Sequence, residues 1–226
     1  SDFEIVPNDV NLGDVVVSAT RNATKRRLAP TLVNVLDAKI FDRTQSSFLS
    51  QALKYQPGVR VEDNCQNCGF SQVRINGLDG PYSQILVDSR PVYSALAGVY
   101  GLEQIPTNMI ERIEVMRGGG SALFGSSAIA GVINVITKDP TSSSASFSHE
   151  IRGIGGLNTF ENTTNLNATY VTENNKLGIT IFGQLHHRSP YDYTGDGYSE
   201  LPMLDGSNVG MRAFFRVSDY SKLTAE

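Results

Sequence analysis

The chain of 226 residues has no tryptophan, two cysteines and three histidines, and it carries no excess of basic residues. No apolar run approaches the ~18 residues that a membrane-spanning helix needs. The net charge of -4 excludes a general affinity for polyanions, and no basic aromatic stripe is present, so we expect no nucleic-acid partner. Ser1–Ile5 lack the basic and apolar character of a signal peptide, which leaves a cytosolic chain or one whose leader has been removed.

The two cysteines, Cys65 and Cys68, form a lone C-x-x-C motif. A structural zinc site needs four ligands, and every histidine lies far downstream. A thioredoxin-type motif needs a strand before the pair and a helix from its first cysteine, whereas Asn64, Asn67 and Gly69 predict a polar turn. We favour a disulfide that pins this turn, which would indicate an oxidising compartment, over zinc, redox catalysis or free thiols.

A glycine-rich segment lies between two strand-like runs, Ile113–Arg117 and Gly131–Thr137. It does not fit a Walker loop, because no lysine follows its last glycine in the required place, nor a dinucleotide fingerprint, because Leu123 stands where a glycine is needed. We therefore interpret Gly118–Gly120 and Gly125 as positions of positive φ or close chain approach.

The first part of the chain, to about residue 140, mixes short strands, short helices and turns, which predicts a small α+β domain. Ser46–Tyr55 has the pattern of a helix, with Ser46 or Ser47 as its N-cap and Pro57–Gly58 as its stop. Pro106 predicts a helix start just before a strand. The other expected strands are Thr31–Leu36, Val59–Val61, Gln72–Ile75 and Gln84–Asp88.

After the polar linker Thr141–Ser146 the pattern becomes one of alternation. In Val209–Ser218 the apolar side chains occupy every second position, and Asn165–Thr172 and Leu177–His186 behave alike, with Ser146–Gly153 weaker. These lengths are close to the ~9–11 residues of a membrane-spanning β-strand with an apolar outside and a polar inside. A soluble sheet with one wet face is the alternative.

The turns between these runs alternate in length. Glu173–Asn175 predicts a tight turn, and His187–Asn208 predicts a long loop, an asymmetry typical of outer-membrane barrels. Four or five strands cannot close even a barrel of ~8 strands. On the barrel reading the chain is thus an N-terminal piece of something longer, and Lys222–Glu226 begins another strand.

Several blocks, taken in order, resemble the TonB-dependent outer-membrane receptors. The most specific are Ile110–Gly118 and Ser121–Ile136; Val73–Gly77 and Ile85–Val92 resemble two further strands of the family, with Asn76 standing where the family usually has arginine. The resemblance implies an α+β plug domain followed by antiparallel β-strands of an incomplete transmembrane β-barrel. Its expected divisions are an N-terminal segment over 1–24, a plug over 25–140 and barrel strands over 141–226.

The resemblance also implies a transporter rather than an enzyme, located in the bacterial outer membrane. TonB would add a β-strand to a TonB-box-like run. The nutrient would be haem or another iron complex, with a corrinoid as the alternative. The lipid of the outer membrane and a surface lipoprotein are further expected partners. The residues expected to bind TonB are Asp14, Val15, Val16, Val17, Ser18 and Ala19.

Further site residues follow from the same resemblance. Arg74 and Arg117 would pair with barrel-wall carboxylates beyond Glu226. The Asn64–Gly69 insert resembles haem and corrinoid receptors of Bacteroidetes type. The substrate-facing residues would be Cys65, Cys68, Phe70, Tyr93 and Tyr100.

The long loop carries a partial EF-hand pattern, which predicts a Ca²⁺ site at Asp192, Asp196 and Glu200; a solvated acidic loop is the alternative. His186 and His187 are adjacent in a strand, so we expect them to face opposite sides and not to share an ion.

Two other classes of function remain open at this stage. One is a soluble plug-like binding or signalling module, which would be a folded monomer without detergent. The other is a periplasmic thiol–disulfide enzyme, which would lose a reductase activity on Cys65→Ser substitution.

Overall fold

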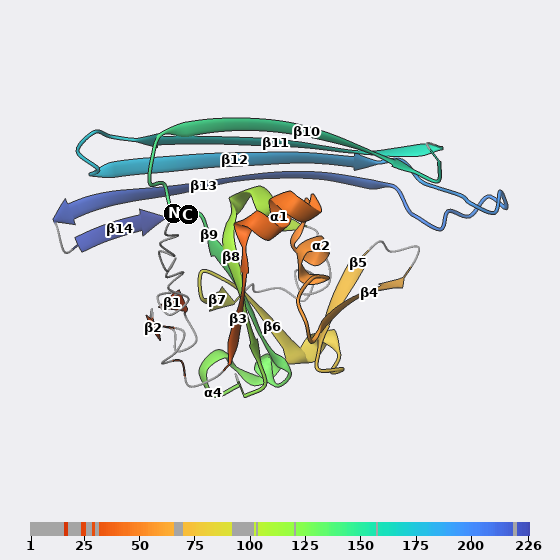
Figure 1. The fold of residues 1–226 in the computed structure, drawn as a ribbon, viewed down its shortest axis with the longest axis horizontal. Helices are drawn as coiled ribbons and strands as arrows, with labels where there is room; N and C mark the ends of the chain where they lie inside the picture. Colours follow the sequence, from red (N-terminus) through yellow and green to blue (C-terminus); the bar gives the residue numbers. More distant parts are fainter. Residues whose placement is uncertain are drawn as a thin grey trace, which may run out of the picture.

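In the computed structural model, the C-terminal sheet lies across one end of an N-terminal domain, as Figure 1 shows. The structure describes residues 32–65, 70–91, 104–119, 121–156, 158–218 and 221–226, together with Val16, Val17, Thr24, Lys25, Ala29 and Leu102. This arrangement confirms the expected fold class, a plug-like α/β region followed by antiparallel strands.

The N-terminal domain is built on a five-stranded mixed sheet in the order β3-β8-β9-β6-β7. β9 runs parallel to β6 and antiparallel to β8. The expected strands of this domain are therefore confirmed. Their bounds are β3 Val33–Asp37, β6 Ser83–Val87, β7 Arg90–Pro91, β8 Ile110–Arg117 and β9 Gly131–Thr137.

Helices and a hairpin surround this sheet. An antiparallel hairpin of β4 (Val59–Cys65) and β5 (Phe70–Ile75) leans away from it, and a short pairing joins β1 (Val16–Val17) to β2 (Thr24–Lys25). The helices and 3-10 turns whose bounds the structure describes are α1 Ala38–Thr44, α2 Leu49–Leu53, η2 Gly80–Tyr82, η3 Thr107–Met109, α4 Ser121–Phe124 and η4 Ser126–Ala128.

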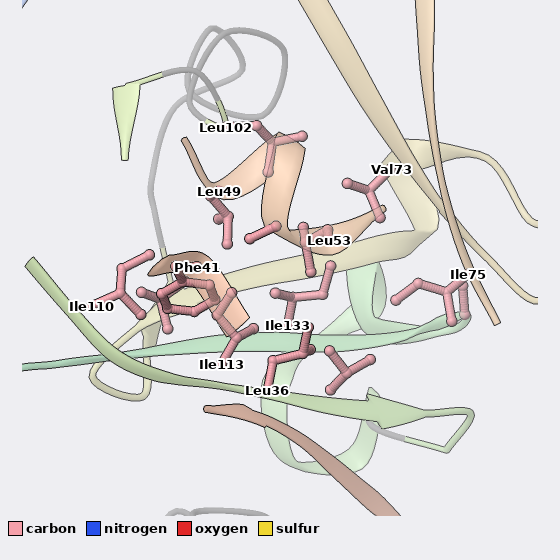
Figure 2. Close-up of a cluster of buried hydrophobic side chains, with 14 residues drawn as sticks. Leu36, Phe41, Leu49, Leu53, Val73, Ile75, Leu102, Ile110, Ile113 and Ile133 are labelled. Atoms are coloured by element: carbon pink, nitrogen blue, oxygen red, sulfur yellow. The ribbon is translucent and has the colours of Figure 1, made fainter. Parts of the chain in front are cut away.

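Apolar side chains are buried on both faces of the N-terminal sheet. On β8, Ile113 and Val115 pack beneath α1 and α2, as Figure 2 shows for Ile113, whereas Met116 joins a second cluster with Phe124 of α4. A strand covered on both sides reads as a nearly continuous apolar run, which is why the sequence of β9 lacks strict alternation, whereas β8 keeps charged residues such as Glu111 and Arg112.

The N-cap of α2 differs from the prediction. Phe48 occupies that position without a side-chain hydrogen bond, and neither Ser46 nor Ser47 caps the helix. Both hydroxyls have other partners, Thr44 for Ser46 and Glu150 for Ser47. The Ser47 N–H instead donates to the Gln51 side chain (2.8 Å). A side chain inside the helix thus accepts the hydrogen bond of a backbone N–H that precedes the helix.

The C-terminal sheet contains five antiparallel strands in sequence order. The pairs His187–Asp205 and Arg188–Leu204 extend β12 and β13 beyond the expected strand ends, so the connecting loop spans 189–203 rather than 187–208. The bounds are β10 Ser144–Ile154, β11 Thr159–Val171, β12 Leu177–Arg188, β13 Leu204–Ser218 and β14 Ser221–Ala225.

The two faces of this sheet have opposite polarity, as the alternation predicted. The outward face exposes Phe147, Ile151, Leu166, Tyr170, Ile181, Leu185, Val209, Met211, Phe215 and Val217. The face toward the N-terminal domain buries Glu161, Thr163, Thr180, Gln184 and His186. Among the described helices, none combines the length and apolar character needed to cross a bilayer.

The glycine-rich segment confirms its interpretation where the structure describes it. Gly118 (φ 70°) and Gly119 (φ 52°) turn the chain after β8 in a left-handed conformation that disfavours side chains. Gly131 serves close approach instead, because a Cβ there would lie 2.4 Å from the Met116 carbonyl oxygen. Gly120 lies outside the described residues.

Candidate functional site

The N-terminal domain and the C-terminal sheet meet at η3, where Asn108 donates to the Gly183 carbonyl, and through polar side chains in two larger contacts. We name them the arginine contact, formed by Asp88, Thr137, Asp139 and Arg212, and the helix contact, formed by Ser47, Phe48, Glu150, Gln184 and His186. Because polar and charged side chains are buried at this interface, it is the candidate functional site.

In the arginine contact, Arg212 of β13 reaches three carboxylates, those of Asp88, Asp139 and Glu226. Its Nη1 lies 2.7 Å from Asp88 Oδ2 in the turn between β6 and β7, and its Nε lies 2.7 Å from Asp139 Oδ1 just after β9. Nη1 also donates to the Thr137 hydroxyl, which in turn donates to Asp88. Arg212 and Asp88 side chains are each 15 % exposed, so their charges depend on each other rather than on water.

Asp88 and Ser89 occupy an unusual turn. Both have positive φ (46° and 65°), which costs free energy for residues other than glycine. The buried Asn134 side chain accepts from the Ser89 N–H (2.9 Å), and Asp88 Oδ1 accepts from the Thr137 N–H (3.1 Å). The turn is therefore stabilised from within its own domain and, through Arg212, from the opposing sheet.

Asp139 is anchored by a second cation. Partial burial alone would raise the pKa of its carboxyl, but the hydrogen bond from Lys222 (3.0 Å) and the charges of Lys222 and Arg212 outweigh this and hold the pKa below its ordinary value. The carboxylate is thus charged at neutral pH, and the contact is ionic.

The helix contact fixes the start of α2 to β12. The Gln184 amide, which is 1 % exposed, donates to the Ser47 carbonyl (3.1 Å) and to Asn165 (2.9 Å). The rings of Phe48 and His186 meet edge to face with centroids 4.7 Å apart, a favourable aromatic geometry. The buried Gln184 amide donates to the plug and to its own sheet, so it fixes the orientation of the two parts. It contributes little apolar contact between them.

Charged side chains border the helix contact at the strand ends nearest the loop 189–203. The buried Glu161 accepts from Arg152 (3.2 Å) and lies 3.2 Å from His186 Nε2 and 3.8 Å from Arg188. Arg152 also donates to the Gln45 carbonyl at the end of α1 (3.1 Å). As expected, the neighbouring His187 points the other way, is half exposed and pairs with Asp205.

A cavity of ≈ 670 Å³ lies between the two parts, next to the arginine contact. Its walls come from η3, from the linker that follows β9 and from the inner face of β10–β13. They include Asn108, Thr169, Thr180 and Phe182.

The predicted TonB-binding run is described in part. Val16 and Val17 form β1, which pairs Val16 with Lys25 and Val17 with Thr24. The remaining residues of the run, Asp14, Val15, Ser18 and Ala19, lie outside the described residues, and the role of the run stays a prediction.

The two predicted plug arginines make contacts within the N-terminal domain. Arg74 pairs with Glu62 (2.7 Å) and Asp79 (3.2 Å), and Arg117 lies over Gly58, whose missing Cβ leaves room for it. Their pairing with carboxylates beyond residue 226 stays a prediction. The described residues show the reverse pairing elsewhere: Arg212 of the C-terminal sheet binds carboxylates of the N-terminal domain. The sequence did not suggest this pairing.

The predicted substrate-facing residues are described only at their edges. Cys65 ends β4 and is in register with Phe70 at the start of β5. Cys68, Tyr93 and Tyr100 lie outside the described residues. The disulfide and the ligand contacts stay predictions.

The predicted calcium ligands bind their own loop. Asp192 accepts from the Gly195 (2.6 Å) and Gly197 (2.8 Å) amides, and these bonds lower the pKa of its carboxyl. Glu200 accepts from the Tyr193 amide (2.6 Å). The part of the chain that the structure describes contains no group of three or more side chains poised for a metal, so a Ca²⁺ site here would require these carboxylates to turn inward and stays a prediction.

Comparison with known proteins identifies the N-terminal domain. Residues 25–132 match the family described as TonB-dependent Receptor Plug Domain. The chain carries a TonB-dependent receptor plug. The chain is 37 % identical over 140 residues to part of the protein described as vitamin B12 transporter BtuB of Vibrio vulnificus, a match over 61 % of this chain and 23 % of that protein.

Solved structures extend the likeness from the plug to the C-terminal sheet. The siderophore receptor PirA of Acinetobacter baumannii superposes with a TM-score of 0.74 and 20 % identity over 88 % of this chain and 31 % of its own. A mutant of the ferric enterobactin receptor PfeA of Pseudomonas aeruginosa superposes with a TM-score of 0.69 and 23 % identity. This match covers 93 % of this chain and 33 % of the receptor chain. At these identities the comparison shows a shared fold.

These findings confirm the resemblance to TonB-dependent receptors and the expectation that the chain is not an enzyme, since the matched proteins are transporters and receptors. They also support an outer-membrane location. The chain spans about a quarter to a third of the relatives it matches. The change from plug strand to sheet strand falls between Thr137 and Ser144, close to the expected boundary at residue 140.

Proposed function

We propose that the chain forms the plug and first barrel strands of a TonB-dependent transporter that takes up a scarce nutrient across the outer membrane. The observation that carries the proposal is the polarity of the C-terminal sheet. Its inner face binds the plug through hydrogen bonds and ion pairs, while its outer face presents apolar side chains such as Ile181 and Val209 that suit lipid.

The short pairing of β1 with β2 suits a strand that changes partners. A ladder of two residues on each side contributes little stability, so TonB can add to or replace it at low cost. In this proposal TonB binds the run from Asp14 to Ala19, and its pull acts on the plug that the arginine and helix contacts hold in place.

Two substrate classes compete within this function. The relative that shares 37 % identity is described as a vitamin B12 transporter, whereas the siderophore receptors share 20 % and 23 %, which favours a corrinoid as the first substrate to test. The fold shared with siderophore receptors keeps haem or another iron complex as the second candidate.

Uptake in cells tests the proposal. The full-length protein is expressed in a strain without its own vitamin B12 receptor, with or without functional TonB, and labelled vitamin B12 and a labelled ferric siderophore are supplied in turn. We expect TonB-dependent uptake of one of them. We also expect Val16→Pro to abolish uptake but not surface binding, because proline breaks the added strand, while Val16→Ile serves as the control. Uptake that is equal without TonB would contradict the proposal.

A further inference from the structure

The outward face of the C-terminal sheet is apolar over most of its length and changes character near one end. Its apolar rows begin where Leu177 lies beside Phe215, and they continue to the row that contains Leu166 and Val209. The next two rows cross the same four strands with mostly polar side chains. These are His149, Thr164 and Ser207, beside Leu185, and then Asn162, His187 and Asp205, beside Ile151.

The two polar rows lie at the height where the apolar layer of a bilayer ends. His187 is ten residues beyond Leu177 on β12, which is about 33 Å along the strand and about 25 Å along the membrane normal at a tilt of ~40°. That height matches the apolar band of ~25 Å typical of membrane barrels. The loop 189–203 projects just beyond these rows (Figure 1), and long barrel loops are extracellular. The polar rows therefore lie at the level of the headgroups of the outer leaflet.

A groove of ≈ 400 Å³ runs through the two polar rows. Leu185, which is 62 % exposed, supplies an apolar part of its lining. The polar side chains of its outward-facing lining residues are those of Asn162, Thr164, His187, Asp205 and Ser207. The groove thus combines apolar surface with amide, hydroxyl, imidazole and carboxylate groups.

Hydrogen bonds between neighbouring strands orient part of this lining. His187 Nδ1 lies 2.5 Å from Asp205 Oδ1, and Thr164 Oγ1 lies 2.8 Å from the Nδ1 of His149. The Asn162 amide and the Ser207 hydroxyl make no hydrogen bond to another described residue. Because polar groups at the edge of an apolar layer are costly without partners, these two side chains favour a ligand that both donates and accepts hydrogen bonds.

The charge of the lining indicates the class of that ligand. The groove contains one carboxylate, Asp205, and neither lysine nor arginine, so it lacks the cations that bind a phosphate group. Sugar hydroxyls donate to a carboxylate and to an amide oxygen, and they accept from an amide N–H. The C–H faces of a sugar ring can pack against Leu185. A sugar therefore matches both the polar and the apolar parts of the groove.

We propose that this groove binds the sugar headgroup of a glycolipid of the outer leaflet, whose acyl chains lie on the apolar rows. The proposal rests on the outer-membrane transporter proposed above and adds to it a specific lipid partner for the outward face. Asn162 and Asp205 form hydrogen bonds with the sugar hydroxyls, and Leu185 packs against the ring.

Competition between two lipids with identical acyl chains tests the headgroup. The full-length receptor is placed in nanodiscs with equal amounts of monogalactosyl diacylglycerol and phosphatidylglycerol and is then transferred to detergent. Native mass spectrometry counts the lipids that stay bound. We expect the galactolipid to be retained about fivefold more often, as one or two additional hydrogen bonds predict. Equal retention, or a preference for phosphatidylglycerol, would overturn the sugar site. A receptor that inserts into no lipid would instead overturn the proposed function.

Two variants assign the preference to the groove. Asn162→Leu removes the amide at similar size and should bring the two lipids close to equal retention. Ala168→Leu adds an apolar side chain on the same strand and face, nearer to the membrane centre, and should keep the preference as the matched control. Asp205→Lys should shift retention toward phosphatidylglycerol, a change that lost folding cannot produce. A wild-type preference in either Asn162→Leu or Asp205→Lys refutes the proposed site.

Discussion

In the plug most buried side chains are apolar and lie on both faces of the sheet, with Asn134 as a polar exception, whereas in the C-terminal sheet most buried side chains are polar and the large exposed ones are apolar. Ile113 and Ile133 are fully buried in the first, and Gln184 is 1 % exposed in the second while Leu185 beside it is 62 % exposed. The same element, a β-strand, is thus used with opposite polarity in two halves of one chain.

This contrast teaches how one part can move against another without unfolding. The plug has its own apolar core, which water drives together. Its contacts with the sheet are hydrogen bonds and ion pairs such as Arg212–Asp88, which water or a solute can replace. In the proposed function, this polar interface would therefore give way before the apolar core when TonB pulls on the plug.

The plug core should be the most sensitive region. Ile113→Ala removes a fully buried side chain beneath α1 and should lower the free energy of plug unfolding by about 2–5 kcal/mol. Ile129→Ala makes the same change at a plug position that is 53 % exposed and should have almost no effect. Urea titration of the receptor in detergent measures both, and equal losses would break the contrast between core and surface.

A charged substitution on the outer face of the C-terminal sheet should destabilise folding into a bilayer. Ile181 lies in the middle of β12, so Ile181→Lys should cost about 2–4 kcal/mol of folding into a bilayer. Leu177→Lys, at the strand end, should cost clearly less because the lysine can reach the interface. Folding of the full-length protein into lipid vesicles gives both values, and a tolerated Ile181→Lys would argue for a soluble sheet.

The arginine contact should tie the two halves together by a smaller amount. Arg212→Ala leaves Asp88 and Asp139 without this cation and should weaken plug attachment by about 2 kcal/mol. The effect should appear as faster hydrogen exchange in the β6–β7 turn. Arg216→Ala, which removes a more exposed arginine on the same strand, is the control. Equal exchange in both variants would show that Arg212 does not hold the plug.

The ionic part of this contact should depend on pH. Because the pKa of Asp139 is lowered in the folded protein, its contribution is present above the ordinary carboxyl pKa and is lost as the pH falls through the lowered value. The stability difference between wild type and Asp139→Asn should therefore be constant near neutral pH and shrink toward about pH 3. A difference that grows on acidification would contradict this sign.

The smallest expected effect concerns the loop 189–203. Asp192→Ala should speed hydrogen exchange at Gly195 and Gly197, because the Asp192 carboxylate accepts hydrogen bonds from their amides. Global stability should change little. Asp196→Ala removes one bond, to the Tyr198 amide, and is the milder comparison. If added Ca²⁺ slows exchange in the wild-type loop but not in Asp192→Ala, the predicted calcium site gains support, and no response speaks against it.

Patterns within one strand or turn were predictable from sequence, and partners far apart in the chain were not. The alternation in Val209–Ser218 already put Arg212 on the polar face, and the left-handed turn at Gly118 follows from glycine alone. The pairing of Arg212 with Asp88 joins residues more than a hundred positions apart, so no local signal could reveal it. The predicted cap of α2 by Ser47 failed for the same reason, because Glu150 of the distant sheet engages Ser47, whereas Ser46 is engaged locally by Thr44.

Spin labels placed one by one along β12, from Leu177 to Arg188, test the account most directly. In the full-length receptor in lipid bilayers, labels at odd positions such as 181 and 185 should be accessible to oxygen dissolved in the lipid. Labels at even positions such as 180, 184 and 186 should be accessible neither to oxygen nor to a water-soluble quencher, because the plug covers them. Accessibility without a two-residue period, or with even positions facing lipid, would contradict a plug seated on the polar face of a membrane-spanning sheet.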